Sequence, residues 1–343
     1  MKALGVVARR IGRRLIASLP ALLGVFVFTF LLMRVLPGDP ATFFASGPNA
    51  GQAEIDELRR QMGLDRPIPE QLLRYLVDVG TGNLGRSILT GQPVVTDLAQ
   101  RLPASLELSL FSLVIALLVA LPLGVVAALR PNSIIDHGVR MLCTLGVCVP
   151  TFVSGLLLIY VFYYLLGIAP DPTGRLDVFA APPPLVTGFL LVDFLLAGDF
   201  GGWIAAFNQI LLPAFTMVLF VLAPLARMTR GSLLGVLGGD FVRTARSVGM
   251  PAWRVVVVYA LRSAILPVLT VIGIVFSAML GANVLVEKVF SWPGIGSYAL
   301  DALLASDYAP VQGFVLLIAA IFVLVNLTID ILYGLADPRL SIE

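Results

Sequence analysis

The sequence predicts an all-α integral membrane protein with six transmembrane helices and a helical loop region after the first. Hydrophobic residues make up 58% of the 343 residues and charged residues only 13%, with a mean hydropathy of +0.96. Six apolar runs approach or exceed the length of about 20 residues that a helix needs to cross a bilayer. Lysine and arginine gather in alternate connections between these runs, which is typical of membrane proteins. A soluble domain of ordinary composition contains far more charge.

The six runs are separated by polar connections. The first is predicted to be an uncleaved span rather than a signal peptide, because it is long and lacks a small-residue cleavage site. A further apolar segment, Leu185–Leu196, is short and carries Asp193. It is predicted to be an interfacial or re-entrant part of a loop and not a seventh span. The six spans are expected at Ile16–Val35, Leu106–Leu129, Val139 to about Leu166, Ile210–Leu225 with its flanks, Ile265–Val286 and Val311–Leu332.

The distribution of basic residues predicts the orientation. Fourteen lysines and arginines lie in the N-terminus, the C-terminal tail and two of the connections, whereas the short loops on the other side contain only Arg175 and Lys288. The long 37–102 loop is left out of this comparison, because long translocated segments follow the charge rule poorly. Both termini are therefore expected in the cytoplasm. The predicted divisions are 1–36 (N-terminus and first helix), 37–102 (exported helical loop region), 103–335 (core with five helices, a cytoplasmic insert at 240–267 and exported loops at about 169–207 and 288–308) and 336–343 (cytoplasmic tail).

Two exported segments have recognisable patterns. Ala53–Gly63 and Gln71–Val79 are amphipathic at helical spacing, so they are expected to form helices. Such helices either cap a channel mouth or bind an external partner, or they only pack on the spans. The segment Phe290–Gly296 contains one proline and two glycines, which indicate a turn. Trp292 in this turn suits a membrane interface.

The cytoplasmic insert, Asp240–Pro267, is unusually basic for this chain. Within Asp240–Arg262, its pattern predicts two short helices separated by a break at Gly249–Pro251. The first helix is expected to present Phe241, Ala245 and Val248 along one side. Ala245 and Gly249 are small enough to allow a partner's backbone to approach closely. The alternative is an amphipathic helix that rests on anionic lipid through its arginines.

The motifs that the sequence lacks limit the function. There is no phosphate-binding loop with a glycine before a lysine, and no His/Cys spacing typical of a metal site. The net charge of +2 gives no indication of a nucleic-acid partner. The predicted spans carry acidic residues only near their ends, at Glu107 and Asp330. An ion-driven carrier would be expected to need central charges, so any energy is expected to come from another chain.

The chain resembles the permease subunits of the peptide and nickel family of ATP-binding-cassette importers. It is most like the B-type subunit of the dipeptide permeases. The resemblance runs essentially from end to end, and a combination of short motifs carries it. These motifs are Arg34–Pro40, Gly63–Pro67, Gly82–Ser87, Thr187–Leu191, Phe241–Gly249, Phe290–Gly294, Asp307-Tyr308, Val311–Gly313 and Asp337–Arg339.

This resemblance implies a type I importer permease fold in the bacterial inner membrane. It also implies a second homologous permease subunit, two ATPase subunits that bind ATP and magnesium, a periplasmic substrate-binding protein and a peptide substrate. This chain is expected to bind no cofactor or metal of its own. Its role is then to move dipeptides or short peptides by alternating access. Import of nickel, glutathione or haem is the alternative within the family, and an ion-coupled secondary carrier or a membrane-bound receptor or assembly scaffold is the alternative from other classes.

The resemblance also assigns candidate site residues. Arg243 stands where the family's coupling segment has glutamate, and Gly249 stands at the family's glycine. A Gly249→Arg variant is expected to uncouple transport while the protein still inserts, because a bulky charge would fill the site of close approach. The residues expected to couple to the ATPases are Asp240, Phe241, Arg243, Thr244, Ala245, Arg246, Gly249 and Pro251, and those expected at a periplasmic gate or binding-protein contact are Trp292, Pro293, Gly294 and Asp307.

Overall fold

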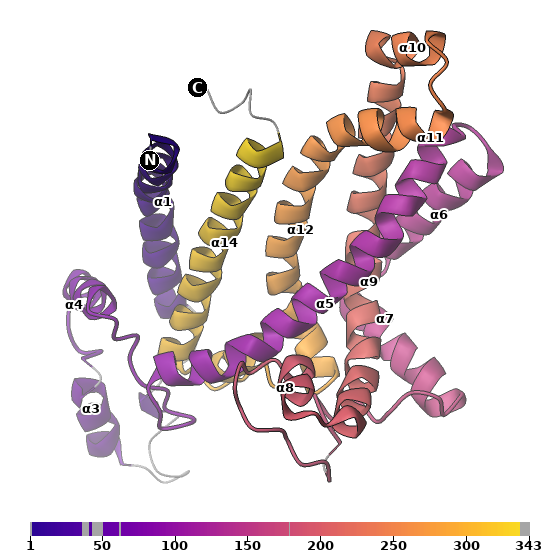
Figure 1. Ribbon diagram of the computed structural model, residues 1–343. Helices are drawn as coiled ribbons and strands as arrows, with labels where there is room; N and C mark the ends of the chain where they lie inside the picture. Colours follow the sequence, from indigo (N-terminus) through magenta and orange to yellow (C-terminus); the bar gives the residue numbers. More distant parts are fainter. Residues whose placement is uncertain (1, 36–40, 43–50, 62, 178, 337–343) are drawn as a thin grey trace. The chain divides into compact units, whose positions relative to one another are not determined.

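The computed structural model describes residues 2–35, 41–42, 51–61, 63–177 and 179–336. The described residues form helices joined by loops and contain no strand beyond an isolated bridge between Arg86 and Pro93, which confirms the all-α prediction. The helices are α1 (Lys2–Val35), α3 (Gln52–Gln61), α4 (Ile68–Gly80), α5 (Val94–Leu129), α6 (Ile134–Cys148), α7 (Thr151–Leu158), the π-helix η1 (Ile159–Leu165), α8 (Leu190–Ala197), α9 (Phe200–Leu237), α10 (Asp240–Ser247), α11 (Ala252–Arg254), the π-helix η2 (Val255–Ala260), α12 (Leu261–Val289), α13 (Ile295–Leu304) and α14 (Tyr308–Ala336) (Figure 1).

Five of these helical segments are long and apolar enough to cross a membrane, and a bent pair makes a sixth span if it is counted as one. The chain divides into two compact units. The first unit contains residues 1–103 and 293–323, and the second contains 104–292 and 324–343. The helices α5 and α14 each contribute to both units.

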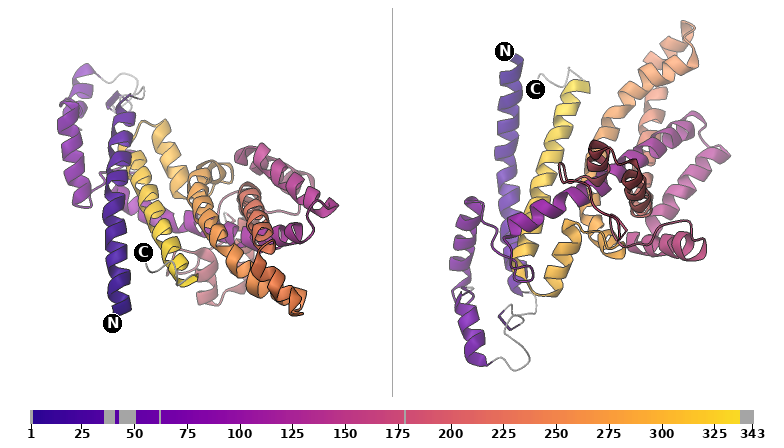
Figure 2. Two further views of the ribbon diagram at one scale, coloured as in Figure 1. Left: turned by 90° about the horizontal axis from the view of Figure 1, so that it is seen from above. Right: turned by 60° about the horizontal axis from the view of Figure 1, so that its bottom comes forward.

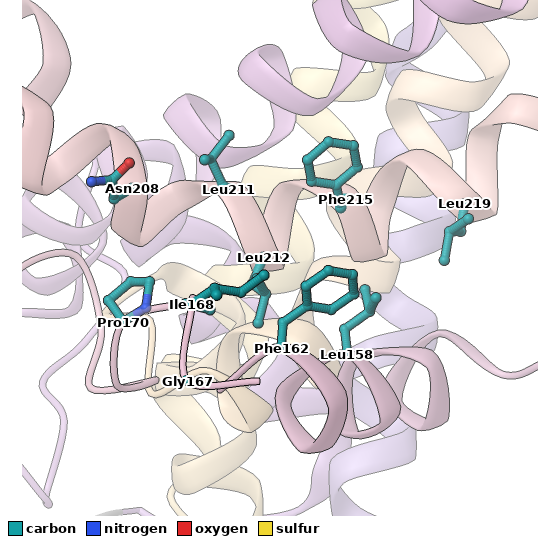
Figure 3. Close-up of a pocket in the computed structure, with 11 residues that line it drawn as sticks. Leu158, Phe162, Gly167, Ile168, Pro170, Asn208, Leu211, Leu212, Phe215 and Leu219 are labelled. Carbon is teal, nitrogen blue, oxygen red and sulfur yellow. The ribbon is translucent and has the colours of Figure 1, made fainter. Parts of the chain in front are cut away.

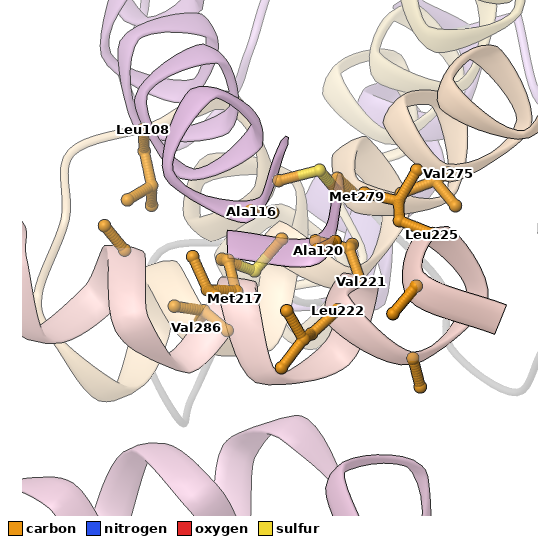
Figure 4. Close-up of a cluster of buried hydrophobic side chains, with 14 of the residues drawn as sticks. Leu108, Ala116, Ala120, Met217, Val221, Leu222, Leu225, Val275, Met279 and Val286 are labelled. Atoms are coloured by element: carbon orange, nitrogen blue, oxygen red, sulfur yellow. The ribbon is translucent and has the colours of Figure 1, made fainter. Parts of the chain in front are cut away.

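The core of the second unit lies where α5, α9 and α12 meet (Figure 4). Ala116 and Ala120 on α5 are fully buried, and side chains this small allow membrane helices to approach closely. Gly124 is also a point where two helices approach closely, because a methyl group there would lie 2.6 Å from Cβ of Thr229. Larger side chains fill the remaining space, among them Leu108, Met217, Val221, Leu225, Val275, Met279 and Val286. Around this core, α6, α7 and α8 pack against α9.

The third predicted span is broken. The helical pair Ile134–Gly146 and Thr151–Leu165 is bent by 99°, so the span predicted from Val139 to about Leu166 is not one continuous helix. Pro150 explains the break, because it disfavours helical dihedrals in the residue before it. Val149 is extended, with φ −97° and ψ 126°. Pro150 then takes the N-cap position of α7, which is the start of the second arm.

Several other helices extend beyond their predicted spans. The helix α5 begins at Val94, inside the loop region predicted to end at residue 102. The fifth span is part of a continuous helical stretch, Ala252–Val289, rather than Ile265–Val286 alone. The apolar run marks only the part of a helix that suits lipid, and nothing requires the helix to end there. The segment Asp240–Arg262 is consequently not a pair of short helices, because its second half is the first part of the fifth membrane helix.

Candidate functional site

The short helix α10 lies at the point where α9 ends and the fifth span begins (Figure 1). Its buried side consists of Val242 and Ala245, which are 0% and 8% exposed. They pack against Val255 of η2, together with Val236, Leu237 and Met250. Burial of an aliphatic side chain as large as valine contributes about 1.5–3 kcal/mol. This apolar contact therefore fixes α10 to the ends of both long helices.

The opposite side of α10 is exposed. Phe241 and Val248 are 46% and 66% exposed, and Asp240, Arg243, Thr244 and Arg246 are exposed as well. The prediction that Phe241, Ala245 and Val248 share one accessible side is therefore wrong for Ala245. Helical spacing shows which residues share a side, but it does not show which side the rest of the chain covers. Here the covered side is centred between Val242 and Ala245.

The C-terminus of α10 explains why a glycine stands at position 249. Gly249 has φ +77°, a left-handed conformation that glycine adopts without the penalty that a side chain brings. Its N–H donates to the carbonyl of Arg246, at 3.0 Å, and the N–H of Met250 donates to that of Ala245, at 3.2 Å. This pair of bonds is the Schellman motif that ends many helices. The glycine is therefore required by the backbone, whether or not a partner approaches it.

Further exposed side chains extend the surface of α10 onto the beginning of the fifth span. Pro251 is exposed at the N-cap of α11, and Trp253 is 65% exposed. A hollow of about 410 Å³ is lined by Phe241, Val258, Tyr259, Arg262 and Ser263. We use the name α10 surface for the exposed residues Phe241, Val248 and Trp253 together with Arg243 and Arg246. Trp253 and Tyr259 were not predicted as site residues, although aromatic residues in a basic segment are a usable signal.

A buried ion pair joins α9, the helix that precedes α10, to α6. Asp136 of α6 is 0% exposed. Its two carboxylate oxygens accept hydrogen bonds from Nε and Nη2 of Arg230 of α9, at 2.5 and 2.7 Å. The N–H of Asn132 also donates to this carboxylate, at 2.9 Å. Two-pronged arginine–carboxylate pairs fix orientation as well as distance. The pair therefore fastens the last two turns of α9 to the start of α6, and it was not predicted from the sequence.

The end of the second unit that carries α10 and this ion pair is called the α10 end. The other end, called the loop end, carries the 167–199 loop. There Glu107 of α5, 5% exposed, forms an ion pair with Arg175, and it accepts a hydrogen bond from the N–H of Leu191 at 2.8 Å. Arg175 also donates to the carbonyl of Gly188, at 2.8 Å. Glu107 thus holds this loop through an ion pair and a hydrogen bond.

Asp193 organises the same loop from within α8. It is 1% exposed. Its Oδ1 accepts from the N–H and the hydroxyl of Thr187, at 2.8 and 2.7 Å, and its Oδ2 accepts from the N–H of Gly188, at 3.0 Å. Burial opposes ionisation, but these hydrogen bonds outweigh it and lower the pKa of Asp193. The apolar Leu185–Leu196 segment is therefore a short helix and a turn joined by one carboxylate.

Trp292 also lies at the loop end, but it is 2% exposed. Its indole Nε1 donates to the carbonyl of Ala104, at 2.9 Å, so it is not the exposed interfacial side chain that the sequence suggested. Nearby, the hydroxyl of Ser105 donates to Glu287 at 2.5 Å, and the amide of Asn283 donates to the hydroxyl of Ser109 at 2.6 Å. These contacts join α5 to α12 through buried polar groups.

In the first unit, Asp307 is buried and holds the loop that precedes α5. Its Oδ2 accepts from the hydroxyl of Ser87 at 2.8 Å and from the N–H groups of Ile88 and Leu89 at 2.7 and 3.2 Å. Its Oδ1 has no hydrogen-bond partner among the described residues. Burial accordingly raises the pKa of Asp307, against the opposing effect of these hydrogen bonds. Asp97, which accepts from the hydroxyl of Tyr298 at 2.9 Å, adds a second carboxylate nearby.

The residues predicted for a periplasmic gate thus differ in accessibility. Pro293 is exposed and Gly294 is buried, while Trp292 and Asp307 are 2% and 0% exposed. The buried side chains have positioning roles within their own units. A direct contact between these residues and an external protein stays a prediction.

The second unit also contains a cavity of about 640 Å³ between the η1 region and α9 (Figure 3). Phe162, Leu212 and Phe215 are among its apolar lining residues. Asn208 is the only lining residue with a polar side chain in the part of the chain that the structure describes. A ligand with two formal charges would therefore find no ionic partner among these lining side chains.

The fold and these features define a multi-pass membrane protein with an exposed basic segment joined to two of its spans. Residues 120–342 match the family described as "Binding-protein-dependent transport system inner membrane component". Residues 7–109 match the N-terminal family of the same systems. The first match covers more than half of the chain, so the chain belongs to this family. It is a permease component of a binding-protein-dependent transport system in the inner membrane.

Several curated proteins are similar over nearly their whole length. The probable D,D-dipeptide transport system permease protein DdpB of Escherichia coli K12 is 42% identical over 318 residues, which is 93% of both chains. The di/tripeptide transport system permease protein DppB of Pseudomonas aeruginosa is 42% identical over 330 residues, covering 96% of this chain and 98% of the relative. The dipeptide transport system permease protein DppB of Escherichia coli K12 is 39% identical over 330 residues, covering 96% and 97%.

Proposed function

We propose that this chain is one of two permease subunits of an importer of dipeptides or short peptides, driven by separate ATPase subunits. The observation that carries the substrate class is the similarity to permeases named for dipeptide and di/tripeptide transport, at 39–42% identity over more than nine tenths of the chain. A periplasmic substrate-binding protein delivers the peptide. This chain binds no cofactor, and the partner subunits hold ATP and magnesium.

Force enters this permease at the α10 surface. The buried contact of Val242 and Ala245 fixes α10 to α9 and η2, so a displacement of α10 moves both long helices. The exposed Phe241, Val248 and Trp253 give an ATPase an apolar surface, and the arginines around them complement acidic groups on a partner. The ion pair of Asp136 and Arg230 passes the movement from α9 to α6. Alternating access then follows from rigid-body movement of these helices.

Both termini and the α10 end face the cytoplasm in this proposal. Two ion pairs locate the ends of the second unit: Asp136 with Arg230 at the α10 end, and Glu107 with Arg175 at the loop end. Positively charged loops stay on the cytoplasmic side of a membrane. The basic residues at the α10 end are Arg130, Arg140, Arg227, Arg230, Arg243, Arg246, Arg254 and Arg262, whereas the loop end has Arg175 and Lys288.

Substrate selection rests mostly with the binding protein. A dipeptide carries an ammonium and a carboxylate group, and both need polar partners when they leave water. The cavity beside α9 offers only the amide of Asn208 among its described lining side chains. It therefore does not hold the two charged ends of a peptide. Weak contacts along the path also suit a permease, since the substrate must leave as readily as it enters.

Transport by the purified complex tests the substrate and the energy source together. The complex is isolated through a tag on this chain, placed in liposomes with its substrate-binding protein, and supplied with ATP inside or with none. Accumulation of a radiolabelled dipeptide is expected with ATP, and excess unlabelled dipeptide is expected to compete. Uptake of nickel, glutathione or haem without uptake of any dipeptide would overturn the substrate class. Equal uptake with and without ATP would overturn the energy source.

A further inference from the structure

The helix α4 has three sides with different chemistry. Gln71, Tyr75 and Val79 form a partly buried side. The adjoining side is polar and exposed, and it contains Glu70, Arg74 and Asp78. The third side is apolar and exposed, and it consists of Leu73, Leu76 and Val77, which are 63%, 40% and 64% exposed. An exposed apolar stripe on a helix needs a partner or a lipid surface.

The helix α4 lies beside α1 within the first unit (Figure 2), and its partly buried side makes the contacts. The ring of Tyr75 stacks on Phe26 with 4.9 Å between ring centroids and lies 6.1 Å from Phe30. The amide oxygen of Gln71 accepts a hydrogen bond from Nε of Arg34, at 2.9 Å. All three contacted residues of α1 belong to the candidate membrane span Gly12–Val35.

These contacts place α4 beside the candidate membrane span of α1. Phe26 and Phe30, on which Tyr75 stacks, lie nine and five residues before the end of α1 at Val35. A helix rises 1.5 Å per residue, so Tyr75 lies about 8–13 Å back along the span. The hydrocarbon core of a bilayer is about 30 Å thick. With the orientation of the proposed function, on which this step rests, the part of α4 around Tyr75 is therefore beside the outer half of the span and not above it.

The depth of α4 and its exposed apolar side lead to one conclusion. We propose that α4 is an interfacial membrane helix whose Leu73, Leu76 and Val77 lie among the acyl chains of the outer leaflet, while Glu70, Arg74 and Asp78 face the lipid head groups and water. This is the arrangement of amphipathic helices that lie on membranes. The occupant of the exposed apolar side is lipid, and α4 anchors the exported loop region to the membrane beside α1.

The charges on α4 indicate which lipids it needs. The exposed Arg66 and Arg74 are matched by Glu70 and Asp78, and Arg66 forms an ion pair with Glu70 at 2.5 Å. A polar side without net positive charge gains little from anionic head groups. Membrane contact therefore depends on the apolar side chains, and it is expected to be the same in zwitterionic and anionic bilayers.

Depth-dependent quenching tests the proposal on the intact complex. Single cysteines replace Leu73, Val77 or Asp78, one at a time, in a variant in which Cys143 and Cys148 are serine. Each is labelled with a small environment-sensitive fluorophore, and the purified complex is placed in nanodiscs with or without lipids spin-labelled on the acyl chain. Asp78 is the matched control, because it lies on the same helix but on its polar side.

We expect spin-labelled lipid to quench the probes at Leu73 and Val77 at least threefold more than the probe at Asp78, with the same ratio in zwitterionic and anionic nanodiscs. Equal quenching at the three positions would overturn the proposal. It would also be overturned if Leu73 and Val77 were shielded from the lipid label in the complex but exposed after removal of the other subunits. That second result would assign the apolar side to a protein partner.

Discussion

The two ends of the second unit expose similar apolar side chains but use their charges in opposite ways. At the loop end, the buried carboxylates of Glu107 and Asp193 are bonded to the loop itself. At the α10 end, Arg230 is held in a buried ion pair, while Arg243 and Arg246 surround Phe241 and Val248 on the exposed side of α10. The loop end is therefore built to maintain its own structure, whereas the α10 end leaves charge and apolar surface available to a partner.

The largest expected effect comes from the ion pair at the α10 end. Arg230→Met removes both hydrogen bonds of the guanidinium to the buried carboxylate of Asp136 and leaves only the longer contact with Arg140, at 3.7 Å, among its described ion pairs. The loss of this pairing is strongly destabilising at a buried site. We expect at least a tenfold loss of ATP-dependent uptake and less assembled protein in the membrane. The matched control is Arg227→Met, one turn away on α9, because Arg227 is exposed and donates to the carbonyl of Ala223 within its own helix.

The double variant Asp136→Leu with Arg230→Met separates stability from force transmission. The double variant has no buried charge left without a partner at this pair, so we expect the amount of assembled protein to recover. Uptake per assembled complex is expected to stay low, because α9 is no longer fastened to α6. Full recovery of uptake would show that the pair is only structural.

Two buried carboxylates, Asp193 at the loop end and Asp307 in the first unit, give the next effect, and they are expected to respond in opposite directions. Both oxygens of Asp193 are hydrogen-bonded, whereas Oδ1 of Asp307 has no partner among the described residues. Asp193→Asn loses charge-assisted hydrogen bonds and is expected to cost about 2 kcal/mol at neutral pH. Asp307→Asn is expected to be neutral or stabilising, because the amide keeps an oxygen for Ser87 and removes a poorly compensated buried charge.

The pH dependence follows from the two pKa directions. The pKa of Asp193 is lowered in the folded protein. The stability that ionised Asp193 contributes is therefore fully present above its pKa in the unfolded chain, about 3.9, and is lost as the pH falls through its pKa in the folded protein. The pKa of Asp307 is raised in the folded protein. The wild type therefore loses stability as the pH rises from the pKa of this carboxyl in the unfolded chain through its pKa in the folded protein. Thermal unfolding in detergent from pH 3 to 8 checks both. A stabilised Asp193→Asn or a strongly destabilised Asp307→Asn would contradict this assignment.

The buried and exposed sides of α10 are expected to give different phenotypes. Val242→Ala removes two carbons from the contact with Val255 and is expected to lower stability by about 1.5 kcal/mol. Phe241→Ala removes an exposed ring and is expected to leave the melting temperature unchanged while ATP-dependent uptake falls severalfold. Parallel melting and uptake measurements on the two variants distinguish the sides. The same loss of stability in both would show that Phe241 is also part of the internal packing.

The smallest effect concerns the backbone at Gly249. A residue with a side chain costs about 1–2 kcal/mol in the left-handed conformation, but asparagine is tolerated there more readily. We expect Gly249→Asn to retain most of the uptake and Gly249→Ala to lose about 1 kcal/mol of stability. If a close approach of the partner fixes this glycine, both variants would uncouple ATP hydrolysis from uptake at unchanged stability. Gly249→Arg alone does not separate these causes, because it changes the backbone and the surface together.

The sequence predicted the features that depend on local composition. Apolar runs located the spans, and the basic segment around Arg243 located α10. The sequence could not give the limits of the fifth span, since a helix continues past the lipid without a change in local pattern from Trp253 onward. Proline is common in membrane helices, and only the structure shows that Pro150 breaks its helix while Pro213 lies inside one.

The contacts that shape the site join residues far apart in the chain. Asp136 and Arg230 are separated by 94 positions, and Glu107 and Arg175 by 68. No local pattern identifies such partners, because any of several arginines could pair with either carboxylate. The covered side of α10 was not predictable for the same reason. It depends on Val255, which follows the break at Gly249 and folds back onto Val242.

The central claim is that the α10 surface, and not the loop end, contacts the ATPase subunits. A photo-reactive phenylalanine analogue is placed at Val248 or at Leu196, two apolar positions that are 66% and 63% exposed at opposite ends of the second unit. Irradiation of the intact complex in membranes is expected to join the ATPase subunit to Val248 and not to Leu196. Cross-linking of the ATPase to Leu196, or of lipid alone to Val248, would contradict the account.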